Sequence, residues 1–501
     1  MAKIKYKDRL KVLFVTSEAA PLAKAGGLGD VAGSLPKVLA RDYHMEVRIV
    51  LPKYKSINME KFPAEQIMND IKLKMPNNHS EKMDVYKTYL PGTIIPVYLL
   101  DMPELFVGED VYDHNVQGRD THIPFVYFSK AAIELVKAMD WKPDIIHIQD
   151  WMMGLIPKWL KTTYLDNAFF KDTSVVLTVH NIAYQGKLDY KSAKLFGLKK
   201  SQFKRVSKFN PSDEINILGE AILNSDMINT VSPNYARELL TKKYGFGLQK
   251  LLRFKKKNFT GILNGIDYSN FDPRTNPDTP VKYWIENLDK KVENKLILQK
   301  KFGLTQSPDL PLICAITRLT HQKGLDLIDD VLKELTDMGA QFIILGSGAE
   351  SIEKIFIKAE KEYPKAVAAE MRFDADLAQT IYAGSDMLLM PSRFEPCGLS
   401  QIIAMRFGTI PIVRHTGGLA DTVTDGTTGF VFRHYDKNAF LWAIRRAVDV
   451  YYNQKDHWRK MQTNAMKEDF SWTSSTKKYL WLYKKAIQNH KQFLKARDES
   501  K

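Results

Sequence analysis

The chain has 501 residues, of which 44% are hydrophobic and 26% are charged, so it has the composition of a folded globular protein and is too long for one core. Its net charge is +15, but the basic clusters at residues 199–208 and 253–257 stand in no recognisable nucleic-acid-binding module. We therefore expect a solvated basic surface, with attraction of small anionic substrates as the alternative, and no nucleic-acid partner.

Two cysteines, Cys314 and Cys397, are too few for a disulfide framework or a cysteine-based metal site. The N-terminal stretch is basic, but its apolar run over residues 12–15 is too short for a signal peptide. No stretch reaches the ~18 apolar residues of a membrane span. We expect a cytoplasmic protein without a membrane partner, and the sequence leaves the oligomeric state open.

Short apolar runs alternate with stretches of helical spacing along nearly the whole chain. Helices are expected over about 31–40 and 125–139 and from residue 326, whereas residues 55–90 are polar and irregular. The predicted strands are residues 11–15, 46–51, 96–100, 144–148, 174–179, 227–231, 312–316, 341–345, 387–390 and 410–413.

Strands that alternate with helices predict parallel, doubly wound sheets and an α/β fold. Because the pattern pauses around residues 253–260 and then restarts, we expect two Rossmann-like domains facing a central cleft. The predicted domains are residues 1–257 and 258–478. A basic amphipathic helix over 479–501 is expected to pack back on the first domain.

A polar loop follows the predicted strand at 387–390, at the carboxyl end where open α/β sheets bind ligands. From Gly398 the spacing turns helical, so the first backbone N–H groups point back at this loop. The next strand ends in Thr416-Gly417-Gly418, where glycines would let a ligand approach the backbone. Glu395 therefore stands beside two sets of amide donors, which suits a sugar with a charged leaving group; alternatively, Glu395 pairs with Arg393 in an ordinary turn.

Residues 24–30, KAGGLGD, follow a strand and open a helix. Their glycines allow positive φ and close backbone approach, and the helix N-terminus favours an anion, although such turns also occur for tight packing. The loop lacks the spacing of a dinucleotide-binding fingerprint and of a P-loop, which disfavours NAD and ATPase functions. Gly346-Ser347-Gly348 also lacks a third glycine and is interpreted as a structural turn.

Charged and polar residues end several other predicted strands. Arg318 and Lys323 flank one strand-to-helix loop. The planar guanidinium of an arginine and the point charge of a lysine together suit a diphosphate. We favour this role over the alternative that both are merely solvated cations on a loop. His180 and Asn181 follow another strand, and Asp150 a third, which favours a functional role over a satisfied polar residue.

Asp374-Ala375-Asp376 is similar to the metal-binding D-x-D pair of some glycosyltransferases. We instead expect a helix cap, because Gln379 stands three positions after Asp376 and completes a capping box. No other residues offer metal ligands at useful spacing, so no metal is expected.

Taken together, these loops resemble the bacterial glycogen synthases and plant starch synthases over nearly the whole chain. The matching segments are TSEAAPLAKAGGLGDVAGSLP, HIQDWMMGLIP, TVHNIAYQG, INTVSPNYARE, GILNGIDYSNFDP, TRLTHQKGLDL, PSRFEPCGLSQI and RHTGGLADTV. The resemblance implies a two-domain glycosyltransferase of the B fold. It would transfer glucose from ADP-glucose, a co-substrate, to the non-reducing-end 4-hydroxyl of an α-1,4-glucan such as glycogen, with retention and without a further cofactor.

The resemblance also implies roles for individual residues. Lys24 and Gly27, in the loop that ends at Asp30, would reach the donor's phosphates across the cleft, and Arg318 and Lys323 would hold the diphosphate. Glu395 would act at the donor glucose. The remaining implied substrate contacts are His180, Asn181, Asp150, Asn264, Gln322, Phe373, Cys397, Gly398, Leu399 and Ser400.

One position departs from the wider fold. Related transferases carry a second Glu eight positions after the first, where this chain has Ile403. The alternatives left open are UDP-glucose as donor, a sucrose, trehalose or cell-wall acceptor, and a non-catalytic nucleotide-sugar binder.

Overall fold

The computed structural model describes residues 9–75, 80–108, 111–112, 121–197, 199–203, 206, 208–209 and 214–500. The chain forms two compact units. The first comprises Met1–Val231, Ala236–Ile262 and Trp472–Lys501, and the second comprises Ser232–Tyr235 and Leu263–Ser471. These limits differ slightly from the predicted 257 and 479, because β11 (Phe259–Gly261) pairs with β10 of the first unit and α16 begins at Trp472.

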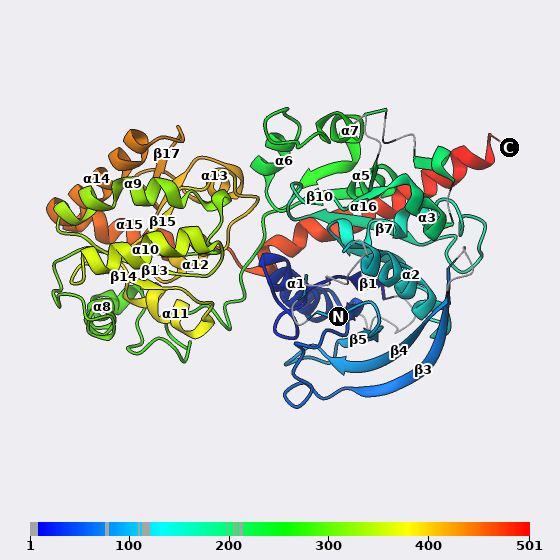
Figure 1. Cartoon of the computed structure of the whole chain (residues 1–501), viewed down its shortest axis with the longest axis horizontal. Coiled ribbons are helices and arrows are strands. Elements are labelled where there is room, and N and C mark those ends of the chain that lie inside the picture. The colour runs from blue at the N-terminus through cyan, green and yellow to red at the C-terminus, as the bar shows by residue number, and fades with distance from the viewer. Residues whose placement is uncertain are drawn as a thin grey trace, which may run out of the picture. The chain divides into compact units, whose positions relative to one another are not determined.

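The first unit is built on a mostly parallel sheet with the strand order β11-β10-β7-β6-β1-β2-β5-β4-β3 (Figure 1). Its described strands are β1 Lys11–Val15, β2 Glu46–Pro52, β3 Glu65–Lys74, β4 Ser80–Tyr89, β5 Pro96–Asp101, β6 Ile145–Gln149, β7 Ser174–Val179, β10 Met227–Thr230 and β11, with a separate pair β8 Lys187–Asp189 and β9 Glu214–Asn216. The central strands are short apolar runs buried along their length, as helices on both faces require.

The prediction that residues 55–90 are irregular is wrong. β3 and β4 pair antiparallel, and β4 pairs antiparallel with β5. The hairpin escaped the sequence pattern because it lies at the edge of the sheet with polar residues on an exposed face, so apolar periodicity is weak there.

Helices flank this sheet. They are α1 Gly27–Tyr43, α2 Ile123–Ala138, α3 Ile156–Leu160, α5 Ile217–Asn224, α6 Pro233–Leu239, which begins in the second unit, α7 Gln249–Phe254 and α16 Trp472–Asp498, with shorter 3-10 turns at Trp151–Met153, Tyr190–Phe196, Lys200–Phe203 and Lys256–Asn258. The long α16 packs on α1, β7 and β10. Its Tyr483 hydroxyl lies 2.9 Å from His147 Nδ1 on β6.

The second unit has a parallel sheet of strand order β14-β13-β12-β15-β16-β17. The strands are β12 Leu312–Ile316, β13 Gln341–Leu345, β14 Val367–Glu370, β15 Met387–Met390, β16 Ile410–Arg414 and β17 Phe430–Phe432. The helices are α8 Lys291–Lys301, α9 Leu325–Asp337, α10 Glu350–Glu362, α11 Ala375–Gly384, α12 Ser400–Arg406, α13 Gly417–Thr422, α14 Lys437–Asn453 and α15 Lys455–Lys467, with 3-10 turns at Ile285–Lys290 and His321–Lys323.

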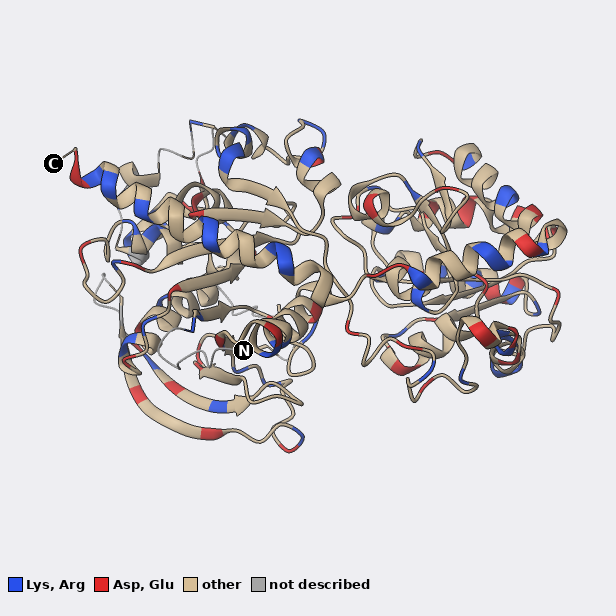
Figure 2. Ribbon diagram, turned by 180° about the vertical axis from the view of Figure 1, so that it is seen from behind, with Lys and Arg blue, Asp and Glu red and all other residues tan. Residues whose placement is uncertain are grey.

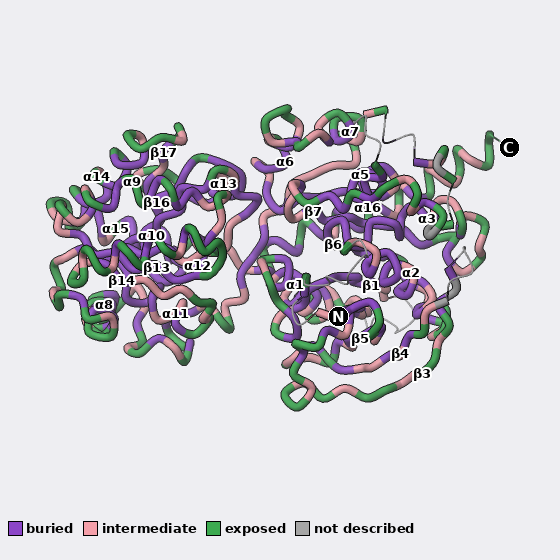
Figure 3. Tube along the Cα trace, in the orientation of Figure 1, coloured by how far each residue is buried: buried purple, intermediate pink, exposed green. Residues whose placement is uncertain are grey.

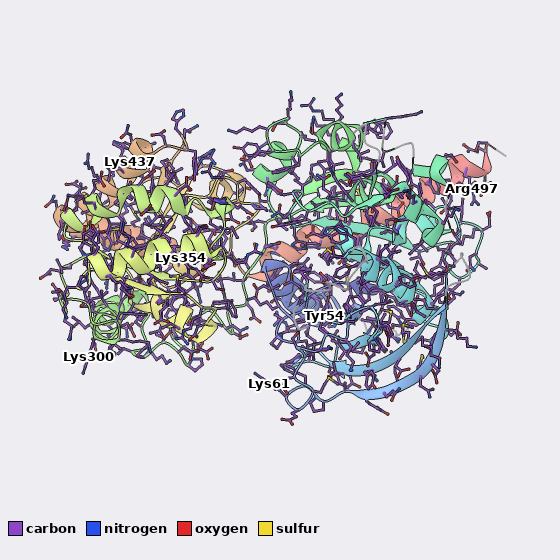
Figure 4. All side chains as sticks on the ribbon, in the orientation of Figure 1. Tyr54, Lys61, Lys300, Lys354, Lys437 and Arg497 are labelled. Atoms are coloured by element: carbon purple, nitrogen blue, oxygen red, sulfur yellow. The ribbon has the colours of Figure 1, made fainter. Side chains whose placement is uncertain are left out.

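Each unit has a buried core around its sheet and a charged surface. Figure 3 shows the buried segments along the central strands, and Figure 2 shows basic and acidic residues interspersed on the helices of each unit. Figure 4 shows Lys300, Lys354 and Lys437 at the outside of the second unit. Two of these lysines form surface ion pairs, Lys354 with Glu350 and Lys437 with Glu334.

Two predicted basic segments are only partly described. Residues 204, 205 and 207 of the 199–208 cluster and residues 1–8 at the N-terminus lie outside the described residues. Within the described part of the chain, no helix is both long and apolar enough to cross a membrane.

Candidate active site

Several of the predicted functional loops lie where the strand order reverses in each sheet. In the first unit β1 has β2 on one side and β6 on the other, so the segment before α1 and the segment after β6 leave the sheet at this switch point. In the second unit β12 lies between β13 and β15, and the loops after β12 and β15 meet in the same way. Such switch points bind ligands in open α/β sheets.

In the second unit Glu395 pairs with Lys323. Lys323 Nζ donates to Glu395 Oε2 over 2.6 Å, and the Ser392 hydroxyl donates to the same oxygen over 3.0 Å. The two charged side chains are only 16% and 6% exposed, which strengthens their attraction. The alternative that Glu395 pairs with Arg393 is wrong, because the Arg393 guanidinium turns outward to Asp326 at 2.7 Å.

Backbone contacts tie the two loops of this switch point together. Arg393 N–H donates to the Gln322 carbonyl over 2.8 Å, and the Gln322 side-chain amide donates to the Phe394 carbonyl over 3.2 Å. Buried Arg414 donates to the Ser392 carbonyl over 3.1 Å. The Lys323–Glu395 pair is therefore held by a rigid frame rather than by the two side chains alone.

The glycines at 417 and 418 do not leave their backbone open to a ligand on the side where a side chain would stand. A Cβ on Gly417 would lie 1.7 Å from the Glu395 carbonyl oxygen, and one on Gly418 would lie 2.2 Å from the Cys397 carbonyl oxygen. Gly418 N–H donates to the Glu395 carbonyl over 3.1 Å. These glycines therefore have a packing role, since they let α13 pack against the loop of Glu395, and the expected approach of a ligand to this turn stays a prediction.

Arg318 is an exposed cation at this switch point. Its side chain is exposed, and among the described residues no carboxylate pairs with its guanidinium. The loop that carries Arg318 packs closely against the turn of Gly346 and Gly348. A Cβ on Gly346 would lie 1.9 Å from the Thr317 carbonyl oxygen, and one on Gly348 would lie 2.3 Å from the Leu319 carbonyl oxygen. The glycines of this turn are thus structural, as predicted, and they present Arg318 to solvent.

The segment after Glu395 supplies mostly backbone and small side chains. Gly398 has φ +73°, which favours glycine, and Leu399 occupies the N-cap position of α12 without a capping hydrogen bond from its side chain. The Ser400 hydroxyl donates to the Ile316 carbonyl over 3.3 Å. Burial raises the pKa of the Cys397 thiol to about 12, so it stays protonated near neutral pH.

Two further predicted contacts of this unit differ in exposure. Asn264 is 3% exposed, and its Oδ1 has no hydrogen-bond partner among the described residues. Phe373, in the loop before α11, is 74% exposed and free to stack on a planar group. Ile403 lies buried in α12 as part of the core.

The predicted capping box is wrong in its position. Asp374, not Asp376, caps α11 by accepting a hydrogen bond from Leu377 N–H over 2.9 Å. The third helical position is therefore a leucine, which cannot complete a box. In the described part of the chain, no group of three or more His, Cys, Asp or Glu could hold a metal ion.

In the first unit, the loop before α1 is organised by a carboxylate that the sequence analysis missed. Buried Glu18 accepts hydrogen bonds from Ala25 N–H at 2.8 Å and Gly26 N–H at 2.7 Å. Lys24 Nζ donates to Asp30 Oδ1 over 2.7 Å, and Lys24 and Gly27 are exposed.

Two expectations for this loop therefore change. None of Gly26, Gly27 and Gly29 has positive φ, and Gly29 is instead required for close packing, since its Cβ would lie 3.0 Å from Glu18 Oε2. Two of the amides expected to face an anionic ligand already bind Glu18.

Asp150 and His180 lie together at the carboxyl ends of β6 and β7. Asp150 Oδ1 accepts from His180 N–H over 2.7 Å and from Asn181 N–H over 3.4 Å. Asp150 adopts φ +58°, an uncommon value for a residue with a side chain and a sign of local strain. Burial raises the pKa of Asp150 to about 7, and burial lowers that of His180 to about 3. His180 is therefore neutral near pH 7, with Nε2 2.9 Å from Gln149 Oε1.

The first unit also has a groove of about 440 Å³. Aromatic side chains line it, namely Trp151, which follows Asp150, and the exposed rings of Tyr184 and Phe246. Gln185 and Lys187 add polar groups. Flat rings with a few polar groups suit the apolar face and hydroxyls of a sugar. Only proximity to His180 and Asn181 in sequence pointed to Tyr184, and nothing in the sequence pointed to Phe246.

The chain is similar to known proteins along almost its full length. The family described as "Starch synthase catalytic domain" matches residues 11–254, and "Glycosyl transferases group 1" matches residues 298–468. Proteins named glycogen synthase from Thermosipho africanus and Thermotoga maritima are each 44% identical over 95% of this chain and 99% of their own length.

Solved structures agree with these matches. The catalytic domain of starch synthase IV from Arabidopsis thaliana, bound to ADP and acarbose, has a TM-score of 0.89 and 34% identity, covering 96% of this chain and 100% of that one. Sucrose-phosphate synthase from Thermosynechococcus elongatus, with a TM-score of 0.60, 16% identity and coverage of 95% and 99%, shares the fold.

Proposed function

The chain belongs to the family of glycosyltransferases that comprises bacterial glycogen synthases and starch synthases, and on that basis we propose that it elongates an α-1,4-glucan with glucose from ADP-glucose, with retention. The observation that carries this proposal is the Lys323–Glu395 pair beside the exposed Arg318, at the switch point of a sheet in a chain 44% identical to glycogen synthases. The ADP bound to the similar starch synthase supports the choice of donor.

In this proposal the cations stabilise the departing ADP. Arg318 offers a planar fork and Lys323 a point charge at the end of β12, and Lys24 acts on the same diphosphate from its loop before α1. Phe373 stacks on the adenine. These cations balance the phosphate charge, and we propose that no cofactor or metal takes part. EDTA should then leave the rate unchanged.

At the sugar, the C1–O bond to the diphosphate breaks and a bond forms from C1 to O4 of the acceptor on the same face. The departing phosphate oxygen takes the acceptor's proton, which leaves ADP and a glucan longer by one unit. Glu395 lies at the donor glucose, and neutral His180 with Asn181 and Asp150 supports the positive charge that develops on the ring. We propose front-face attack rather than a covalent glycosyl-enzyme, because the sequence pattern offers no second carboxylate at nucleophile spacing from Glu395.

The acceptor binds in the groove lined by Trp151, Tyr184 and Phe246. Its lining includes Trp151, the residue after Asp150, and Ala183, two residues after Asn181, and on this basis we assign the glucan end to this groove. The cytoplasmic location expected from the sequence stays a prediction.

The test follows nucleotide release from ADP-glucose or UDP-glucose with glycogen, maltose, sucrose or no acceptor. We expect ADP release that depends on glycogen, with chain elongation. Arg318→Ala should lower kcat/KM by about 10²-fold or more without altering the melting temperature, because its side chain is exposed. Arg445→Ala, an exposed arginine on α14, is the matched control and should retain activity.

Other outcomes decide between the alternatives. Preferential use of UDP-glucose, or transfer to sucrose, would replace the proposed donor or acceptor. Tight ADP-glucose binding without nucleotide release would make the chain a non-catalytic binder, and full activity of the Arg318→Ala variant would remove Arg318 from the diphosphate site.

A further inference from the structure

Glu18 is a buried carboxylate that the reaction scheme above does not use. It lies shortly after β1, at the switch point of the first sheet, and is only 2% exposed. Among the described residues no lysine or arginine forms an ion pair with Glu18, so this buried carboxylate needs several hydrogen-bond donors to offset the loss of water.

Those donors come from the loop that carries Lys24. Glu18 Oε2 accepts from Ala25 N–H at 2.8 Å and from Gly26 N–H at 2.7 Å, the two amides between Lys24 and the first residue of α1. Glu18 Oε1 accepts from the Tyr112 hydroxyl at 2.5 Å. One carboxylate thus sets the path of the chain from Lys24 into α1.

The fit around the carboxylate is close. A Cβ on Gly29 would lie 3.0 Å from Glu18 Oε2 and 3.2 Å from Lys24 Cγ, so this glycine leaves the space in which both side chains lie. Asp30, one residue on, holds Lys24 Nζ at 2.7 Å. The direction of Lys24 therefore depends on Glu18 through the backbone and on Asp30 through the side chain.

We propose that Glu18 is a positioning residue for the donor, which fixes the segment 24–27 so that Lys24 and the Gly27 amide meet the diphosphate. This inference rests on the proposed function, because it assigns the phosphate contact to Lys24. What Glu18 supplies is reach and geometry: its side chain must be long enough to place one oxygen within 2.8 Å of two neighbouring amides.

Two substitutions at Glu18 separate reach from charge. Glu18→Gln keeps the length and one acceptor oxygen but loses the charge, whereas Glu18→Asp keeps the charge but is one methylene too short. We expect Glu18→Asp to raise the KM for ADP-glucose and the Kd of ADP about tenfold or more, with the KM for glycogen within about twofold. Glu18→Gln should stay within about threefold of wild type in all three constants.

Two further variants serve as control and as second test. Glu220→Gln changes another buried glutamate of the same unit, paired with Lys158 at 3.0 Å, and should lower only the melting temperature. Gly29→Ala is the second test if Glu18→Asp does not fold. It places a methyl group between Glu18 and Lys24 at a position without positive φ, and it should also raise the KM for ADP-glucose selectively.

The proposal is overturned if Glu18→Asp and Gly29→Ala bind ADP like wild type. It is also overturned if Glu18→Gln is impaired more than Glu18→Asp, since charge would then matter more than reach. If the donor KM, the glycogen KM and the Kd of ADP all change only as far as the fraction of folded protein falls, as expected for Glu220→Gln, then Glu18 has a structural role only. If the wild-type chain releases no ADP from ADP-glucose, the proposed function fails first, and ADP binding by calorimetry still tests the role of Glu18.

Discussion

Replacing Gly417 by alanine should displace the backbone of Glu395. Gly417 has φ +45°, and a Cβ there would lie 1.7 Å from the Glu395 carbonyl oxygen and 2.7 Å from its carbon. Ordinary contact begins at 3.4 Å, so the two segments must separate by about 1.7 Å. The hydrogen bond from Gly418 N–H to the same carbonyl would break.

The magnitude follows from that displacement. Positive φ costs alanine about 1–2 kcal/mol in stability. A misplacement of about 1 Å costs on the order of 10² in rate, so we expect kcat to fall about 10²-fold or more as Glu395 loses its position against Lys323.

Gly426→Ala provides the matched control. Gly426 also has positive φ, +71°, but nothing lies within 4 Å of an added Cβ. Both variants should lose stability from backbone strain, Gly417→Ala the more because it also breaks the Gly418 hydrogen bond, and only Gly417→Ala should lose turnover. Thermal unfolding and steady-state ADP release measure the two effects separately. Equal activity of the two variants would refute the reasoning, because it would mean that the Glu395 loop tolerates the shift.

Three further predictions concern single side chains. Asp150→Asn should raise the melting temperature at pH 8 while lowering turnover, because burial raises the pKa of Asp150 from 3.8 to about 7 and disfavours its ionised form in the folded state. The gain in the free energy of unfolding, of the order of 2–4 kcal/mol, should disappear below pH 4. An equal gain at both pH values would contradict this prediction. Burial lowers the pKa of His490 and nearby Lys161 lowers it slightly, but the attraction of Asp226 outweighs both and the pKa is raised. The stabilisation is then full below the unfolded value of 6.5 and lost as the pH rises through the folded pKa, so His490→Gln should destabilise the fold more at pH 5.5 than at pH 9 in urea unfolding; equal losses would exclude the Asp226 contact as the cause. Phe373→Ala should weaken ADP binding in calorimetry at unchanged melting temperature, since the ring is exposed, and unchanged affinity would remove it from the adenine site.

Local composition was enough to predict where most strands run and which loops leave their carboxyl ends. Central strands such as β7 and β13 are short apolar runs buried throughout, so local composition is sufficient to place them. Parallel strands end at one edge of a sheet, so the strand prediction also puts functional residues at adjacent strand ends. These residues are Asp150 and His180 in one unit and Lys323 and Glu395 in the other.

Which groups bind one another follows from the packed fold and not from the sequence pattern. Lys323 and Glu395 are 72 residues apart, and no local pattern distinguishes that pair from Glu395 with Arg393. The roles of Glu18 and Gly417 depend on backbone atoms brought next to them by the packing of other segments. The spacing of apolar residues predicts which face of a single helix or strand is buried. Contacts between distant segments arise only when the chain packs, and these contacts set the geometry of the site.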